Sequence, residues 1–127
     1  MSKEKFHIEY VFDNVSNHSL WNHLTSPMGL AAWFADRVVI TGNKCVFTWN
    51  KAQEEAEIVS VKPEVSIRFR WLNDEEDISY FEFSIHHLEL TGATSLEITD
   101  FAEPDEKNDA VALWDTQIEA LKRSLGI

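Results

Sequence analysis

Cysteine, glycine, proline and basic residues are all scarce in this sequence. The 127 residues include one Cys, four Gly, three Pro and 11 Lys or Arg. The lone Cys45 cannot form an intramolecular disulfide, which fits a reducing cytoplasm. The small numbers of Gly and Pro exclude fibrous and low-complexity classes. No apolar run approaches the roughly 20 residues that a membrane span needs, and no apolar segment of a secretory signal follows the first residues. We therefore expect a cytoplasmic protein without a membrane span.

The charge is strongly of one sign. The chain carries 22 Asp or Glu against 11 Lys or Arg, which gives a formal net charge of −11. The basic residues are scattered and form no stripe, so the chain should repel phosphate backbones. We expect no nucleic-acid partner, whereas a basic protein partner fits the charge.

Apolar and aromatic residues are plentiful. Hydrophobic residues make up 44% of the chain, and eight Phe, five Trp and two Tyr are among them. A chain of this length forms one domain of ordinary size and buries a core without disulfides or metals. We expect a single domain spanning residues 1–127.

Local patterns predict an ordered series of elements. Alternating apolar and polar residues predict a strand over residues 6–12. Ser16 and Ser26 are suitable N-caps for two short helices, the second with Pro27 at its first position. Period-two patterns then predict strands, with a polar hairpin at 50–55 and an acidic turn at 74–77. The expected strands cover residues 38–40, 45–49, 56–61, 65–71, 78–88 and 94–101.

The end of the chain has the pattern of a long amphipathic helix. Asp105 or Asp109 can cap its start, and Gly126 follows its last turn. Its apolar stripe consists of Val111, Trp114, Ile118, Leu121 and Leu125. The sequence therefore predicts an α+β fold, in which a curved antiparallel sheet of about six or seven strands wraps around the C-terminal helix. The two short helices follow the first strand.

Several motifs carry a family resemblance. Trp21 is followed by Thr25-Ser26-Pro27-Met28-Gly29-Leu30-Ala31-Ala32-Trp33-Phe34, and Pro63 precedes Phe69-Arg70-Trp71. A Thr-x-Leu-x-Ile-Thr strand occupies residues 94–99, and the last helix contains Trp114 and Leu121-Lys122. In this order the motifs resemble the START-like superfamily, also called SRPBCC or Bet v-like, with its helix-grip fold. Within it, the closest likeness is to the family related to the activator of the heat-shock-protein-90 ATPase.

The resemblance implies three functions. Helix-grip proteins often hold lipids, sterols or polyketides between sheet and helix, which implies a protein that binds a small apolar ligand. One alternative is a protein-interaction module similar to chaperone ATPase activators. A second alternative is an enzyme of the cyclase or aromatase kind.

Inward-facing residues are the candidates for the wall of such a cavity. A cavity would be apolar with a few polar groups, but the same residues are equally suited to plain core packing. His87 shares the parity of Phe81, Phe83 and Ile85, so we expect it to reach the interior. The candidates are Trp33, Phe34, Phe47, Trp49, Phe69, Trp71, Phe81, Phe83, His87, Trp114 and Ile118.

The sequence contains few candidates for metal ligands or catalytic residues. The sequence has no His-Glu-x-x-His and no Cys pair, and His18 and His23 are poorly spaced for one helix face, so no metal is expected. Asp100 shares the parity of Leu96 and Ile98, but it lies at the end of its strand. We therefore expect no catalytic residue and no cofactor.

Overall fold

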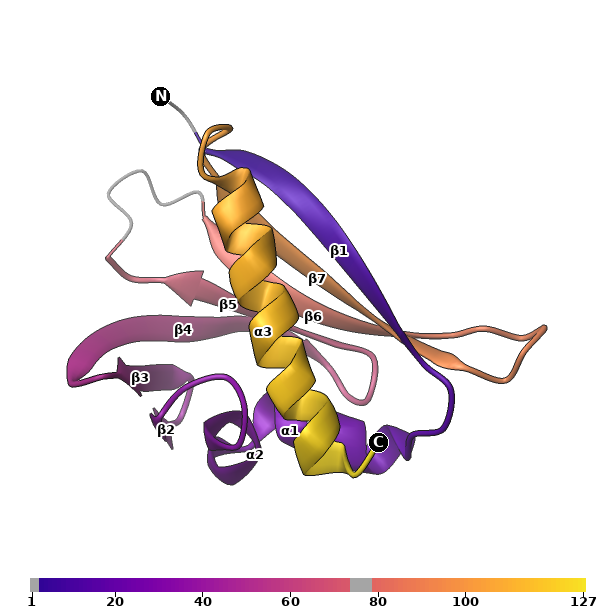
Figure 1. The fold of residues 1–127 in the computed structure, drawn as a ribbon. Coiled ribbons are helices and arrows are strands. Elements are labelled where there is room, and N and C mark those ends of the chain that lie inside the picture. Colours follow the sequence, from indigo (N-terminus) through magenta and orange to yellow (C-terminus); the bar gives the residue numbers. More distant parts are fainter. Residues whose placement is uncertain (1–2, 74–78) are drawn as a thin grey trace.

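The computed structural model describes residues 3–73 and 79–127 (Figure 1). Within these ranges the chain forms seven strands and three helices. Their bounds are β1 (Glu4–Phe12), α1 (Asn17–Thr25), α2 (Pro27–Ala31), β2 (Arg37–Thr41), β3 (Lys44–Trp49), β4 (Ala52–Lys62), β5 (Ser66–Trp71), β6 (Tyr80–His87), β7 (Thr94–Ala102) and α3 (Lys107–Leu125).

The strands form one antiparallel sheet in the order β1-β7-β6-β5-β4-β3-β2. Strands β2 to β7 pair with their neighbours in sequence, and β1 closes the far edge beside β7. In Figure 1 the long helix α3 crosses one face of the curved sheet, and α1 and α2 lie at its lower end. This arrangement confirms the expected α+β fold, in which the sheet wraps around the C-terminal helix.

The two short helices begin at the expected caps. The Ser16 hydroxyl accepts a hydrogen bond from the Ser19 amide at 3.3 Å, and the Ser26 hydroxyl accepts one from the Gly29 amide at 2.9 Å. A side chain at Gly29 would collide with the backbone of Asn22 in α1. Glycine at this position therefore lets α2 pack closely against α1.

Helix α3 buries the middle of its predicted stripe. Trp114, Ile118 and Leu121 are buried against the sheet. The hydroxyl of Tyr10 donates to a carboxylate oxygen of Asp115 at 2.7 Å, which ties α3 to β1. Gly126 takes the left-handed conformation that ends the helix.

The expected cap at the start of α3 is wrong. Within the described residues the N-cap is Glu106, without a side-chain capping bond, and neither Asp105 nor Asp109 occupies that position. Three acidic residues crowd this turn, so their sequence pattern did not single out the true cap.

Two further boundaries differ from the expectation. The polar hairpin is a two-residue turn at Asn50 and Lys51, and β4 begins at Ala52, because residues 53–55 pair with β3. Val65, expected on the inner face, is 50% exposed, because it lies just before β5. The acidic turn at 74–77 and the start of the expected strand at residue 78 lie outside the described residues.

The two arginines of β5 lie on the outer face of the sheet, as the alternation predicted. The guanidinium of Arg68 lies 4.0 Å from the ring centre of Tyr80 and donates to Glu82 at 2.8 Å. Arg70 lies 3.5 Å from Glu57.

No helix formed by the described residues is long and apolar enough to cross a membrane.

Candidate functional site

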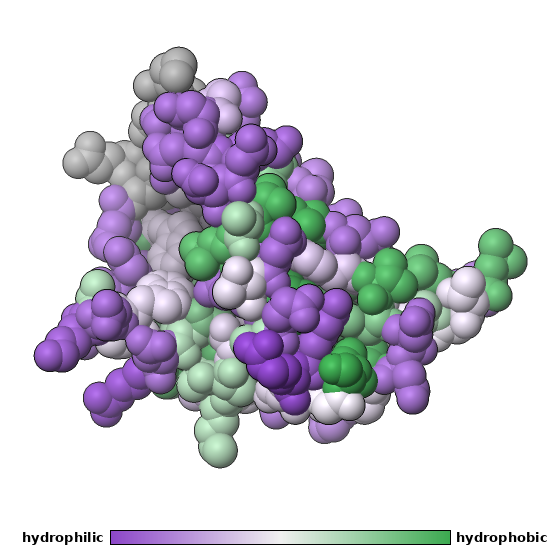
Figure 2. Space-filling view, in the orientation of Figure 1, coloured by the Kyte–Doolittle hydropathy of each residue, from purple (hydrophilic) through white to green (hydrophobic). Residues whose placement is uncertain are grey.

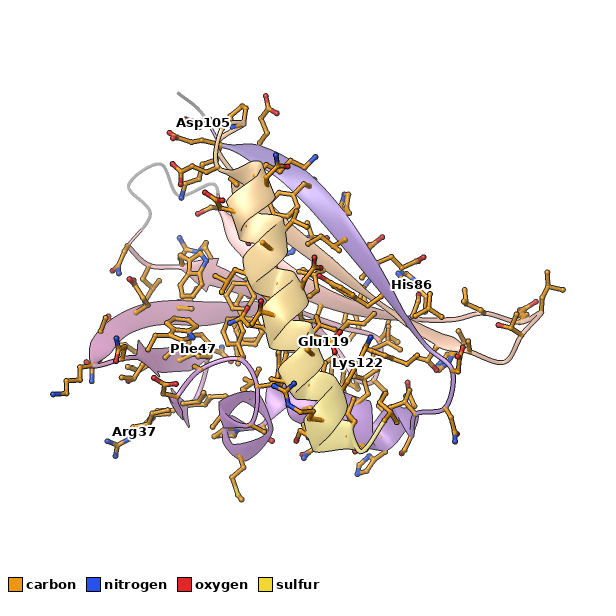
Figure 3. The ribbon with its side chains drawn as sticks, in the orientation of Figure 1. Arg37, Phe47, His86, Asp105, Glu119 and Lys122 are labelled. Atoms are coloured by element: carbon orange, nitrogen blue, oxygen red, sulfur yellow. The ribbon has the colours of Figure 1, made fainter. Side chains whose placement is uncertain are left out.

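An aromatic cluster fills the space between sheet and helix. Its centre is Phe34, which follows α2. The ring centres of six other aromatic residues lie 5.0 to 6.1 Å from that of Phe34: Trp33, Phe47, Trp49, Phe81, Phe83 and Trp114. In Figure 3, Phe47 lies on the side of the sheet that faces α3, whereas Arg37 points away into solvent. The cluster is therefore a continuous aromatic layer beneath the helix.

The cluster does not fill the whole space. A pocket of about 660 Å³ lies between the first half of α3 and the inner face of the sheet. In Figure 2 the surface beside α3 shows pale side chains of intermediate hydropathy, between more hydrophilic groups. The pocket is lined by Lys3, Phe34, Trp49, Glu54, Trp71, Asn73, Ser79, Phe81, Asp100, Ala110, Leu113, Trp114 and Gln117.

Only part of the candidate set reaches the pocket. Phe34, Trp49, Trp71, Phe81 and Trp114 line it. Five other candidates are at most 6% exposed and belong to the packed core outside the pocket wall: Trp33, Phe47, Phe69, Phe83 and Ile118. Some of the aromatic residues thus form the wall of a pocket, and the others pack in the core. The sequence left both interpretations open.

His87 is a wrong prediction. It is exposed at the end of β6 and does not line the pocket. Its parity matches that of Phe83 and Ile85, but β6 and β7 extend as a hairpin beyond the part of the sheet that α3 covers (Figure 1). A residue on the inner face there has no helix above it.

Several residues of the pocket wall were not predicted. Asp100 has the parity of the inner face, but its position at the end of its strand did not favour it as a site residue. Ala110 lies four residues before Trp114 on α3 and Gln117 lies three residues after it, so the helical repeat could have found both. Leu113 lies four residues before Gln117 on the same helix, and Glu54 lies near the start of β4. Lys3, Asn73 and Ser79 lie beside strand ends, where no periodic pattern operates. The unpredicted residues are Lys3, Glu54, Asn73, Ser79, Ala110, Leu113 and Gln117.

Hydrogen bonds fix the side chains of the wall. The indole N–H of Trp49 and the amide of Gln117 both donate to the backbone oxygen of Phe34, at 2.7 and 2.9 Å. The indole N–H of Trp114 donates to Oδ2 of Asp100 at 2.8 Å. The wall is therefore held in place without a ligand.

Asp100 is one of two half-buried acidic residues that line the pocket; the other is Glu54. Burial raises the pKa of the Asp100 carboxyl above the ordinary value, because the charged form loses hydration. Hydrogen bonds from Trp114 and from the Phe101 amide, and the charge of Lys3, oppose this effect. The carboxyl can thus accept hydrogen bonds from a molecule in the pocket, or donate one when protonated.

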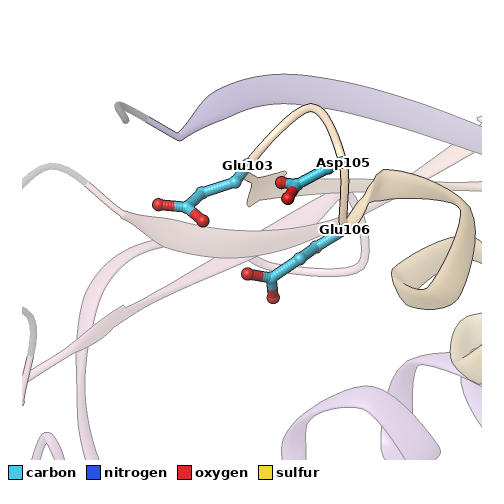
Figure 4. Close-up of side chains that lie close together, drawn as sticks. All are labelled: Glu103, Asp105 and Glu106. Atoms are coloured by element: carbon cyan, nitrogen blue, oxygen red, sulfur yellow. The ribbon is translucent and has the colours of Figure 1, made fainter.

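A second acidic group lies just before α3. Carboxylate oxygens of Glu103, Asp105 and Glu106 lie within 4.8 Å of one another (Figure 4). A hydrogen bond with Glu103 and its negative charge raise the pKa of Glu106. Hard cations such as calcium usually take six to eight oxygen ligands, so three carboxylates at the surface are an incomplete metal site.

A Ser–His pair lies at the opposite end of α3. The imidazole of His23 donates through Nδ1 to the backbone oxygen of Ser19 at 2.8 Å, and its Nε2 lies 2.8 Å from the Ser124 hydroxyl. Ser124 is in the last turn of α3, about 15 Å along the helix from Trp114. The pair fastens α1 to α3 and is not part of the pocket.

Known structures share this architecture. A Bacteroides fragilis protein solved by NMR is 44% identical, over 98% of this chain and 92% of its own, with a TM-score of 0.70. The Aha1 dimer from Colwellia psychrerythraea is 17% identical, over 98% of this chain and 97% of its own, with a TM-score of 0.82. DynU16, from the dynemicin biosynthetic locus, is 19% identical, over 96% of this chain and 47% of its own, with a TM-score of 0.77. The last two likenesses concern the fold alone.

The family match covers every residue. No curated protein shows significant sequence similarity to the chain. The START-like superfamily domain, however, matches residues 1–127. The match confirms the resemblance that the sequence motifs indicated, and the seven-stranded sheet closed over α3 agrees with it. The chain belongs to the START-like superfamily.

Proposed function

We propose that this protein, as a single domain over residues 1–127, binds a small, largely apolar ligand between α3 and the sheet. The observation that carries the proposal is the pocket of about 660 Å³ with five aromatic residues in its wall. Ligand pockets typically measure 300–1,000 Å³ and combine an apolar lining with a few polar groups. The size and chemistry of this pocket fit that description.

The rigidity of the wall supports binding. The rings of Phe34 and Trp114 stack with centres 5.8 Å apart, and both indole donors of Trp49 and Trp114 are hydrogen-bonded. A wall that is already ordered costs little conformational entropy when a ligand enters. Binding should therefore be non-covalent and driven mainly by burial of apolar surface.

Filling the pocket tests the proposal. Ala110 on α3 lines the pocket, whereas Ala112 is exposed on the same helix. Nile red, an uncharged dye, should bind the wild type and Ala112→Phe with increased fluorescence. Ala110→Phe should weaken its binding by about tenfold or more, because the new ring occupies the space of the dye.

Two outcomes would contradict the proposal. One is a wild type that binds neither Nile red nor any small apolar compound. The other is an Ala110→Phe variant that stays folded by circular dichroism and binds the dye as tightly as Ala112→Phe. Native mass spectrometry of freshly purified protein would add the mass of any ligand that is retained.

A second candidate function is protein interaction. Leu90 is fully exposed at the tip of the β6–β7 hairpin, where Figure 2 shows hydrophobic side chains. The net charge of −11 would attract a basic partner over a distance. Comparing Leu90→Ser with the wild type in affinity capture tests this candidate: a protein captured equally by both argues against the hairpin. The enzyme alternative stays a prediction, with Asp100 as the carboxyl that general acid chemistry in the pocket would need.

A further inference from the structure

We infer that the pocket prefers ligands that join a flat apolar body to a protonated amine. This inference rests on the proposed function and specifies the ligand class that the pocket takes. The hydrogen-bonding groups in the wall, the aromatic rings beside them and the balance of charge support this preference.

Four donors of the wall already have acceptors within the protein. The Trp49 indole and the Gln117 amide donate to the backbone oxygen of Phe34. The Trp114 indole donates to Asp100, and the amide of Asn73 donates to Glu54 at 2.6 Å. At these four donors, a ligand that offers acceptors competes with bonds that the protein has already made.

Acceptors remain available. A carboxylate offers about four lone-pair positions, and Asp100 receives the Trp114 indole on one oxygen and the Phe101 amide on the other. Glu54 adds a second carboxylate to the lining. The pocket is thus equipped to accept hydrogen bonds from a ligand, and an ammonium group supplies up to three.

The neighbouring groups favour a positive charge. Trp49, Trp71 and Trp114 present aromatic rings to the pocket, and indole faces attract cations more strongly than other side chains do. Two carboxylates and one ammonium, that of Lys3, line the pocket. Lys3 is exposed, so water screens its charge, whereas half-buried Asp100 acts through a less polar medium.

Lys3 is the group in the wall that would favour an anionic ligand instead. A carboxylate ligand would pair with Lys3 and avoid Asp100. An ammonium ligand would instead lower the pKa of Asp100 and keep its carboxylate ionised at neutral pH. The two ligand classes therefore make opposite demands on the same two residues, and a charge-matched series of ligands separates them.

Three naphthalene compounds of similar shape provide the test. The dissociation constants of 1-naphthylmethylamine, 1-methylnaphthalene and 1-naphthylacetic acid are measured by tryptophan fluorescence or calorimetry at pH 7 and physiological salt. We expect the amine to bind about tenfold more tightly than the neutral compound, and the acid to bind most weakly.

Matched variants locate the preference. Asp100→Asn should reduce amine affinity by about tenfold, and Lys3→Gln should increase it. Glu9→Gln removes the same charge from an exposed position on the outer face of β1 and should change amine affinity less than about twofold. Circular dichroism and binding of 1-methylnaphthalene show whether the Asp100 variant keeps its pocket. Glu54→Gln is a second variant with the same expected direction.

The outcomes separate the two proposals. The preference for amines is overturned if 1-naphthylacetic acid binds as tightly as 1-naphthylmethylamine or more tightly. It is also overturned if Asp100→Asn and Glu9→Gln change amine affinity equally. Both outcomes leave the binding function intact. Failure of all three compounds to bind, while Nile red still binds, overturns the amine preference alone. Failure of the three compounds and of Nile red overturns the proposed function and the amine preference with it.

Discussion

Cys45 lies on β3 and is fully buried, opposite Ile40 and Ala56 in the neighbouring strands. Burial raises the pKa of its thiol to about 11. Because the thiolate is the reactive form, a thiol with this pKa is protonated at pH 8.5. The residue is therefore packed as a small apolar side chain.

Alkylation of Cys45 tests this description. At pH 8.5 iodoacetamide should modify the native protein at least about a hundredfold more slowly than the urea-unfolded chain, because the thiolate fraction falls and the side chain is covered. The unfolded chain is its own control, since the chain has one Cys. Equal rates in the two states would show that the thiol is accessible in the fold.

At the same scale, parity predicted some residues well and failed for others. It placed Phe69, Phe81 and Phe83 correctly, because each lies where α3 and the neighbouring rings cover the sheet. It failed for His87, since parity assigns a face but does not say how far the covering helix extends. Asp100 had the correct parity, but the sequence did not show that the Trp114 indole would meet it.

Strand β5 shows how one element serves both core and pocket. Phe69 is fully buried and stacks on Phe81 with ring centres 4.7 Å apart. Trp71, two residues further on the same face, is half-buried and lines the pocket. The side chains at the two positions should therefore contribute differently to stability.

Truncating each residue measures the difference. Phe69→Ala should lower the free energy of unfolding by about 3–5 kcal/mol, the usual cost of removing a fully packed aromatic side chain. Trp71→Ala should cost about 1–2 kcal/mol, because part of its indole borders open space and loses fewer contacts. Urea denaturation of both variants decides the matter. Equal costs would mean that the pocket is closed in solution.

The order of elements was predictable, and several of their ends were not. Alternation and serine caps located β1, α1, α2 and the strands that follow. Pocket residues such as Lys3, Glu54 and Asn73 lie at ends of elements or beside them, where three-dimensional curvature decides which side chains meet. The local sequence around each of these residues does not show that their side chains meet at one pocket.

At the scale of the molecule, charge is the dominant surface property. The net charge is −11, and several cations of the described part are paired with carboxylates. These pairs are Lys44 with Glu55, Arg68 with Glu82, Arg70 with Glu57 and Lys122 with Glu119. Paired and scattered cations do not form the basic stripe that a phosphate backbone requires.

A gel shift tests the consequence for nucleic acids. At physiological salt, duplex and single-stranded DNA and RNA should show no complex at micromolar protein, because the net charge opposes association. A known basic DNA-binding protein serves as the positive control. A complex with sub-micromolar affinity would contradict the expectation.

The backbone oxygen of Phe34 joins three parts of the molecule. It accepts the indole of Trp49 from β3 and the amide of Gln117 from α3, while its own residue follows α2. Every amino acid carries this oxygen, so no substitution at position 34 can delete it. A mutation at that site changes the aromatic ring, but the backbone oxygen that accepts bonds from β3 and α3 stays in the chain. Substitutions of Trp49 or Gln117 can therefore remove a donor from this junction, whereas no substitution can remove its acceptor.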